Sequence, residues 1–492
     1  MHFTSLNFIV FLTIVFGLYW SMRASRFQNA IIVLASYTFY GWWDYRFCAL
    51  ILVSSLIDFY IGGRIARTQN TSSRKRLLGI SLVCNLGLLA LFKYYGFFVE
   101  NFLSLTQAFG WTPNQLTLNL ILPVGISFYT FQTLSYTIDV YRRQLKPADN
   151  VIDYLAFVSF FPQLVAGPIE RGTNLLPQFQ KQRQFNLRDA SDGCRLILWG
   201  FFKKLAVADV LAIPVDAAYS QWETASSAEL ALATVFFAFQ IYCDFSAYSD
   251  IAIGTARLFS IKLMRNFAYP YFSQSLSEFW CRWHISLSTW FRDYVYIPIG
   301  GNRGGPISQQ RNIFVTFLLS GLWHGAAWTF IIWGAIHGGA LAIEKRFLRG
   351  GNKPALDFSH SPSLFVSPII VIRMLMTFCL VCLGWVFFRA ETIGGALAIT
   401  KRIIYGACSL ELFTSLSQFL GDEKRVRIAL VVLIVFASIE WVQRKHECPL
   451  VEIPNNRLMG RPIRWAAYSV VILFTLDLMA ASDSRAFIYF AF

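Results

Sequence analysis

The stretch that decides the fold is Ile313–Ile343, IFVTFLLSGLWHGAAWTFIIWGAIHGGALAI, which contains no Lys, Arg, Asp or Glu. It does contain two histidines, His324 and His337. Hydrocarbon penalises polar side chains, so an ionisable group in such a segment usually faces a protein interior or a water-filled passage. Histidine can also accept and return a proton near neutral pH. We therefore expect one long membrane helix or two shorter ones here, with His324 as the first candidate for chemistry.

The composition extends this interpretation to the whole chain. Of its 492 residues, 55% are hydrophobic and 14% are charged, whereas soluble proteins carry roughly 25% charged residues. Because about 20 helical residues cross the hydrocarbon core, the apolar blocks predict about eleven or twelve crossings. The candidate spans lie near residues 5–21, 28–43, 47–63, 77–99, 117–140, 151–169, 192–213, 229–256, 313–343, 364–388, 427–442 and 465–480. The chain is predicted to be an all-α, polytopic membrane protein.

Two of these blocks, 151–169 and 192–213, are interrupted by prolines, glycine and lysines (Pro162, Gly167, Pro168, Lys203 and Lys204). Broken backbone at membrane depth is tolerated only where protein or a cavity covers it. Re-entrant or tilted pieces are therefore expected there. No hydrophilic stretch is long enough for a soluble domain, so residues 1–492 are predicted to form a single membrane-embedded domain.

The net charge of +15 does not indicate a nucleic-acid-binding protein. The Lys and Arg residues lie in short loops between apolar blocks, as at Arg64–Arg76. This pattern is typical of cytoplasmic loops that face anionic lipid headgroups. A nucleic-acid partner would call for a basic soluble domain, and we expect none.

The sequence gives no signal for a metal or a bound cofactor. The six histidines and nine cysteines show no zinc-type spacing. Phosphate-binding and nucleophile-elbow motifs are missing, and the glycines around Gly300–Gly305 follow an aromatic segment rather than a strand. We therefore predict neither a metal site nor a bound cofactor.

Residues around His324 suit close helix packing. Gly321 and Gly325 are four residues apart, as are Gly334 and Gly338, and such spacing lets helices approach closely. Ser320 lies one helical turn before His324, on the same face. Two interpretations stay open: His324 only bonds a neighbouring helix, or it acts as a general base in a dry site. A structural role is expected for His337.

A second constellation, Glu278–Asp293 (EFWCRWHISLSTWFRD), mixes tryptophans and arginines with His284. In one continuous helix, the large apolar residues gather on one side: Phe279, Trp283, Leu287 and Trp290. His284 falls about 100° round from them, beside Ser288. Such a helix suits the membrane interface. His284 is then either incidental to a headgroup anchor or a side chain that reaches the same cavity as His324.

Two further polar positions are open to more than one interpretation. Asp244 interrupts the apolar block 229–256, and an intramembrane acid suggests function. Pairing with Arg257 or another basic residue would equally explain Asp244. Gln163 lies in the broken stretch Phe161–Arg171, which could shape a passage or form only a turn.

At these residues the chain resembles the membrane-bound O-acyltransferase family, and within it the bacterial alginate O-acetylase branch. The resemblance covers nearly the whole chain. Its pieces are Phe161–Ile169 (FPQLVAGPI), Gln240–Gly254 (QIYCDFSAYSDIAIG), Phe279–Tyr296 (FWCRWHISLSTWFRDYVY), Leu319–Gly325 (LSGLWHG), Gly384–Ala390 (GWVFFRA) and Phe487–Phe492 (FIYFAF).

The resemblance implies helices around a central tunnel in which an acyl group is transferred. The family's catalytic histidine, in its Trp-His-Gly motif, corresponds to His324, and its upstream polar partner corresponds to His284. The candidates for residues that line the tunnel are Ser320, Trp323, Gln163, Asp244 and Ser288. One departure is Cys281, where this branch leads us to expect a basic residue.

The expected activity is O-acetyl transfer with His324 as general base. The donor is expected to be acetyl-CoA on the cytoplasmic side, where basic loops attract its phosphates. The chain lacks an extracytoplasmic domain, so a separate periplasmic or membrane-anchored acetyltransferase is expected to deliver the group to an exported polysaccharide such as alginate. This places the protein in the bacterial inner membrane.

Other activities stay open. Within the same chemistry, the polymer could be peptidoglycan, cellulose or another cell-wall polymer, or the transferred group could be the D-alanine of lipoteichoic acid. A different class would be a non-catalytic transporter or scaffold of a polysaccharide secretion complex. We find no internal repeat, which argues against a transporter built from inverted repeats.

Overall fold

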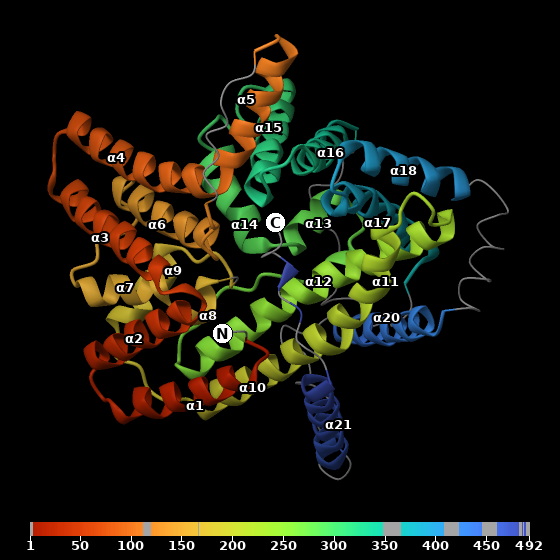
Figure 1. The fold of residues 1–492 in the computed structure, drawn as a ribbon. Coiled ribbons are helices and arrows are strands. Elements are labelled where there is room, and N and C mark those ends of the chain that lie inside the picture. The colour runs from red at the N-terminus through yellow and green to blue at the C-terminus, as the bar shows by residue number, and fades with distance from the viewer. Residues whose placement is uncertain are drawn as a thin grey trace. The chain divides into compact units, whose positions relative to one another are not determined.

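The computed structural model describes residues 3–111, 120–165, 167–347, 366–407, 423–444, 460–481, 485, 487 and 488. Within these ranges the regular structure is helical and no strand occurs, which confirms the all-α prediction (Figure 1). Five helical segments are long and apolar enough to cross a membrane: α3 (Arg46–Arg67), Thr71–Ala108, α12 (Ser227–Leu258), α17 (Pro368–Arg389) and α20 (Lys424–Gln443). The protein is therefore a polytopic membrane protein, and the total of about eleven or twelve crossings stays a prediction.

The described chain forms two compact units. The first consists of Met1–Cys194 with Ala252–Met264, and the second of Arg195–Ile251 with Arg265–Phe492. The prediction of a single domain over the whole chain is untested by this division. All residues of the candidate site belong to the second unit except Gln163.

The helices of the first unit follow one another with short connections. They are α1 (Leu6–Ser21), α2 (Ser25–Asp44), α3, α4 (Thr71–Leu89), η1 (Ala90–Tyr94), α5 (Tyr95–Ala108), α6 (Ile126–Tyr141), α7 (Val151–Ser159), α8 (Phe161–Leu164) and α9 (Gly172–Gln180). The predicted break in 151–169 is present, because α7 ends at Ser159 and α8 has only four residues.

A buried polar cluster joins three of these helices. Asp58 of α3 accepts hydrogen bonds from Ser81 (2.6 Å) and Asn85 (2.8 Å) of α4. Thr133 of α6 donates to Asn85 Oδ1 at 3.0 Å. These side chains are buried, and mutual hydrogen bonds offset the cost of removing them from water. Outward-facing side chains of α3 and α4 are apolar instead, including Val53, Leu56, Ile80 and Val83.

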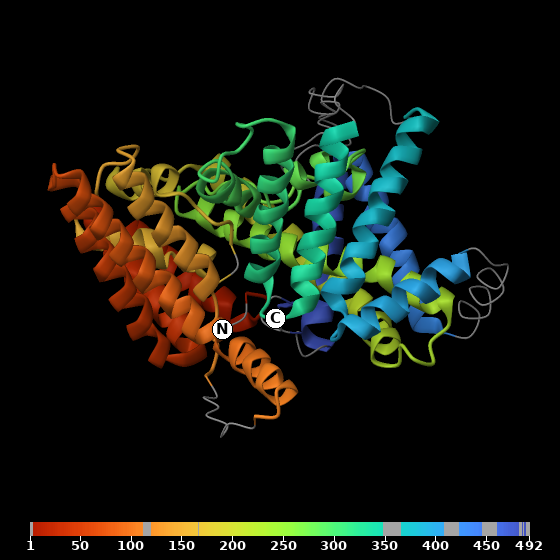
Figure 2. The ribbon, with the colours of Figure 1, turned by 90° about the horizontal axis from the view of Figure 1, so that it is seen from above.

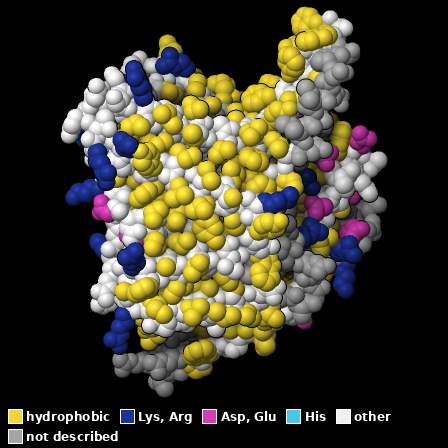
Figure 3. Space-filling view, turned by 60° about the vertical axis from the view of Figure 1, so that its left-hand side comes forward, with side chains coloured by type: hydrophobic (Ala, Val, Ile, Leu, Met, Phe, Trp, Pro, Cys, Tyr) yellow, Lys and Arg dark blue, Asp and Glu magenta, His cyan; other side chains and the backbone are white. Residues whose placement is uncertain are grey.

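The molecular surface has the distribution expected in a membrane. Figure 3 shows a face on which hydrophobic side chains predominate, with Lys and Arg gathered toward its margins. Apolar side chains that face lipid cost nothing, whereas charges are favoured near the headgroups.

The second unit contains the remaining helices. Along the chain they are α10 (Leu187–Phe202, which begins in the first unit), η2 (Lys203–Ala208), α11 (Asp209–Ser220), α12, η3 (Pro270–Phe272), α13 (Leu276–Arg282), α14 (Ile285–Phe291), η4 (Arg292–Tyr296), α15 (Pro306–His324), α16 (Trp328–Phe347), α17, α18 (Ile393–Ala407), α20 and α21 (Gly460–Ala481). The lysine-containing interruption of 192–213 is the π-helical turn η2 between α10 and α11.

The opening stretch Ile313–Ile343 contributes to two helices, α15 and α16, rather than one. Figure 2 shows α15, α16 and α17 side by side, coloured from green through teal to light blue. A Cβ added to Gly321 would lie 3.3 Å from the Cα of Gly334 and would overlap the Phe330 carbonyl. A Cβ added to Gly334 would lie 3.3 Å from the Cα of Gly321 in turn and would overlap the Phe317 carbonyl. The glycine spacing therefore does mark a close approach of helices.

We expect Gly321→Ala to destabilise the protein by about 1–3 kcal/mol, because the added methyl must displace backbone. Gly339→Ala is the matched control: it lies on α16 with open space around its Cβ position. There the change should be neutral or stabilising by up to about 1 kcal/mol, since alanine favours helix. Thermal unfolding of both purified variants in detergent measures the difference. Equal midpoints would contradict the close packing of α15 on α16.

Candidate active site

His284 lies at a break between two short helices. Its backbone has φ 43° and ψ 54°, the left-handed conformation, between the end of α13 at Arg282 and the start of α14 at Ile285. The prediction of one continuous helix over Glu278–Asp293 is therefore wrong. The four large apolar residues predicted to share its face are nonetheless all buried: Phe279, Trp283, Leu287 and Trp290.

Asn266 fixes this break. Its backbone carbonyl accepts a hydrogen bond from the Ile285 N–H at 2.9 Å. Its side-chain Oδ1 accepts from the Ser286 hydroxyl at 2.9 Å, and its Nδ2 donates to Ser249 of α12 at 3.0 Å. A left-handed non-glycine residue costs on the order of 1–3 kcal/mol and persists only where its surroundings impose it. Asn266 supplies that restraint and ties the start of α14 to α12.

His324 is the last residue of α15, and its ring lies close to that of His284. The two ring centroids are 6.3 Å apart. Trp323 lies beside both, with its ring centroid 4.9 Å from that of His324 and 6.0 Å from that of His284. His284 is fully buried, and His324 and Trp323 are 3% and 4% exposed. The structure thus brings the two sequence-predicted histidines together, while their roles in catalysis stay predictions.

Aromatic side chains enclose the histidine pair. Trp333 of α16 and Phe388 of α17 pack edge-to-face on His324, with centroid distances of 5.0 and 5.5 Å. Phe245 of α12 packs edge-to-face on His284 at 4.6 Å. Such walls exclude water and lower the local dielectric, so hydrogen bonds and charges in the site act more strongly than in water.

This burial determines the ionisation of His284. Desolvation lowers the pKa of His284 to about 3, from 6.5, because the charged imidazolium loses its hydration. At neutral pH His284 is therefore uncharged, with one ring nitrogen able to donate a hydrogen bond and the other able to accept one.

The third histidine has a partner of its own. The indole N–H of Trp280 donates to His337 Nδ1 at 3.3 Å, which leaves the His337 proton on Nε2. Trp333 lies between His337 and His324, with ring centroids 5.0 Å from each. His337 thus supports the aromatic wall behind His324.

Three other candidate residues have different surroundings. Ser320 is buried one turn before His324 on α15. Ser288 donates from its hydroxyl to the Trp283 carbonyl at 3.2 Å, within the first turn of α14. Gln163 belongs to α8 of the first unit, where its amide donates to the Phe157 carbonyl at 3.1 Å.

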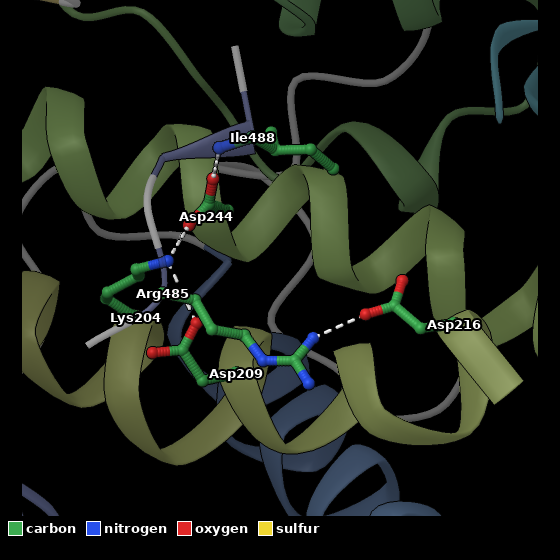
Figure 4. Close-up of polar contacts among 6 residues, drawn as sticks. All are labelled: Lys204, Asp209, Asp216, Asp244, Arg485 and Ile488. Atoms are coloured by element: carbon green, nitrogen blue, oxygen red, sulfur yellow. Dashed lines mark hydrogen bonds and ion pairs between the residues drawn. The ribbon is translucent and has the colours of Figure 1, made fainter. Parts of the chain in front are cut away.

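Asp244 is paired with a basic residue, one of the two interpretations open from the sequence, and that residue is Lys204. The Lys204 ammonium lies 2.7 Å from Asp244 and 2.9 Å from Asp209 (Figure 4). Its neighbour Lys203 pairs with Asp250 at 2.8 Å. The lysines that interrupt one apolar block thus neutralise the acids of another, as buried charges require.

Asn266, Phe245 and Phe388 were not predicted from the sequence. Asn266 lies in an irregular segment, and the two phenylalanines are indistinguishable in composition from the other 45 of the 47 in the chain. A clue for Phe388 was its position in the stretch GWVFFRA.

The fold and the site together define a helical membrane protein with a histidine pair in an aromatic interior. Residues 149–387, which contain both histidines, match the family model described as MBOAT, membrane-bound O-acyltransferase family. The chain belongs to this family and is an O-acyltransferase.

Several relatives share most of its length. A protein named "Probable alginate O-acetylase" from Pseudomonas aeruginosa is 42% identical over 395 residues, 80% of this chain and 73% of that protein. The "Peptidoglycan O-acetyltransferase" of Helicobacter pylori is 35% identical over 85% of this chain and 82% of its own. The "Teichoic acid D-alanyltransferase" of Bacillus subtilis is 26% identical over 80% of this chain and 97% of its own. These similarities confirm the resemblance seen in the sequence motifs.

The burial of His284 predicts a specific dependence of stability on pH. Its pKa is about 3 in the folded protein and 6.5 as the ordinary value, so below pH 6.5 the unfolded chain binds a proton that the folded chain refuses. Stability is therefore lost as the pH falls, by about 2 kcal/mol between pH 7.5 and pH 5 from this residue.

His284→Asn should remove this contribution while retaining a residue type that tolerates the left-handed backbone. Thermal unfolding of the wild type and the variant in detergent, at pH 7.5 and pH 5, measures it. Other groups titrate equally in both proteins, so the difference between the two shifts reports His284. Parallel pH curves would show that His284 is not held in a neutral, dry environment.

Proposed function

We propose that the protein takes an acetyl group from cytoplasmic acetyl-CoA and passes it across the bacterial inner membrane for O-acetylation of an exported polysaccharide such as alginate. The observation that carries the proposal is the position of His324, 6.3 Å from His284 between aromatic walls of α16, α17 and α12. A single substrate group can contact two rings at this spacing, and bulk water is excluded from them.

In the proposed reaction His324 is the general base. It takes the proton of the acceptor hydroxyl, whose oxygen then forms a bond with the thioester carbonyl carbon. The carbon–sulfur bond breaks, and coenzyme A leaves as the thiol after taking up a proton. A positioned base of this kind contributes about 10²–10⁴-fold to the rate.

His284 has a different task, because it is uncharged and is held by its backbone. A neutral imidazole N–H can donate to the carbonyl oxygen as negative charge develops on it, or orient the acceptor. The aromatic enclosure would protect the thioester from hydrolysis during transfer.

The final acceptor is proposed to lie outside the cytoplasm, with a separate periplasmic or membrane-anchored acetyltransferase completing delivery. The name of the Pseudomonas aeruginosa relative, 42% identical over 80% of this chain, supports alginate as the polymer. A second candidate is peptidoglycan, supported by the Helicobacter pylori relative at 35% identity.

His324→Ala should reduce acetyl transfer at least about 100-fold, because the acceptor hydroxyl loses its base. The measurement is incorporation of labelled acetyl groups from acetyl-CoA by membrane vesicles, at protein levels matched by immunoblot. Ile307→Ala is the control, since Ile307 lies on the same helix and is 77% exposed. Near-normal transfer by His324→Ala at a normal protein level would exclude His324 as the base.

The polymer is identified by ester analysis of a deletion strain. Loss of O-acetyl groups from alginate supports the main proposal, and loss from peptidoglycan with alginate unchanged supports the second. Unchanged esters on both, together with a transport defect, would indicate a transporter or scaffold instead.

A further inference from the structure

We propose that Asp244 and Asp216 anchor a C-terminal segment, Arg485 with Phe487 and Ile488, so that Phe487 supports the packing of His284. In this proposal Phe487 is a positioning residue for the transfer reaction and Asp244 is the buried anchor of the segment. The effect on transfer rests on the proposed function, while the anchoring itself can be tested without it.

The buried end of the anchor uses both oxygens of one carboxylate. Asp244 Oδ1 pairs with Lys204 at 2.7 Å, and Oδ2 accepts the backbone N–H of Ile488 at 2.7 Å (Figure 4). The side chains of Asp244 and Lys204 are 3% and 5% exposed. A buried charge needs complete pairing, so the backbone of the segment supplies a partner for a carboxylate oxygen that water cannot reach.

The outer end of the anchor is an ion pair. Arg485 Nη1 lies 2.5 Å from Asp216 Oδ2 on α11, and Asp216 Oδ1 lies 3.0 Å from Arg389 at the end of α17. The side chains of Arg485 and Asp216 are 44% and 46% exposed. Solvent weakens such a pair, so it guides the segment while the buried contacts hold it.

Between these two anchors lies Phe487, which is 1% exposed. Its ring centroid is 4.4 Å from that of Tyr248 and 5.6 Å from that of Phe245, both on α12. The Phe245 ring in turn packs edge-to-face on His284 at 4.6 Å. A continuous series of ring contacts therefore runs from Phe487 through Phe245 to His284.

This series matters because His284 is held in a strained backbone conformation. Such a residue keeps its geometry only while its surroundings remain filled. Without the Phe487 ring, Phe245 can turn toward the vacated space and lose its contact with His284. Displacement of a reacting group by about 1 Å can cost about 100-fold in rate.

The first test replaces the ring. We expect Phe487→Ala to lower kcat for acetyl transfer about 10–100-fold, with KM for acetyl-CoA changed less than about twofold, because the donor's own contacts are untouched. Phe487→Leu, which refills most of the volume, should recover most of the lost rate. Equal kcat for Phe487→Ala and the wild type would overturn the proposal, as would loss of rate only in proportion to loss of folded protein.

The second test replaces the outer ion pair by a covalent link. In the double variant Asp216→Cys with Arg485→Cys, transfer should fall while the thiols are free and recover after linking by dibromobimane, with the linked peptides identified by mass spectrometry. Each of the two substitutions made alone serves as a control for reaction at the native cysteines. Failure of the two positions to link, or linking without recovery of transfer, would overturn the proposal.

The two proposals fail in different ways. A wild-type protein that transfers no acetyl group from acetyl-CoA contradicts the proposed function, and linking in the double variant then still reports whether the segment is anchored. Wild-type transfer with an unaffected Phe487→Ala variant contradicts the positioning role alone.

Discussion

The left-handed backbone at His284 is the constraint on which the site depends. It stops α13, starts α14 and presents the imidazole toward the end of α15, with the two ring centroids 6.3 Å apart. A continuous helix would have carried this side chain about 100° away from its apolar neighbours. Asn266 imposes the break through hydrogen bonds to Ile285, Ser286 and Ser249, so a residue without a place in the chemistry fixes the geometry of the chemistry.

The same economy of polar groups explains the rest of the second unit. Inside a membrane protein each charge must find a partner, and Lys203 and Lys204 of η2 meet Asp250 and Asp244 of α12. The π-helical turn brings both lysines toward one helix, although consecutive residues of an α-helix point about 100° apart. Charge pairing and helix irregularity are thus two sides of one arrangement, and the glycine contact between α15 and α16 provides the close packing beside it.

Much of the fold followed from composition and spacing. The apolar blocks indicated helices, the glycines at 321 and 334 indicated a close helix pair, and the interruptions at 151–169 and 192–213 indicated broken segments, all of which are present. The continuous helix over Glu278–Asp293 was wrong, because periodicity assumes regular backbone and cannot reveal a left-handed residue. The partner of Asp244 was also out of reach, since Arg257 and Lys204 are equally plausible partners until the helices are packed.

By itself, the sequence determined the class of the protein: a helical membrane acyltransferase with His324 in an uncharged run, because hydrophobicity and motif identity are local properties of the chain. Only the tertiary structure decided what surrounds the histidines. Trp333, Phe388 and Phe245 come from three different helices, and Asp244 meets a residue 244 positions away. Contacts at that separation depend on how the helices pack, which no local pattern of residues records.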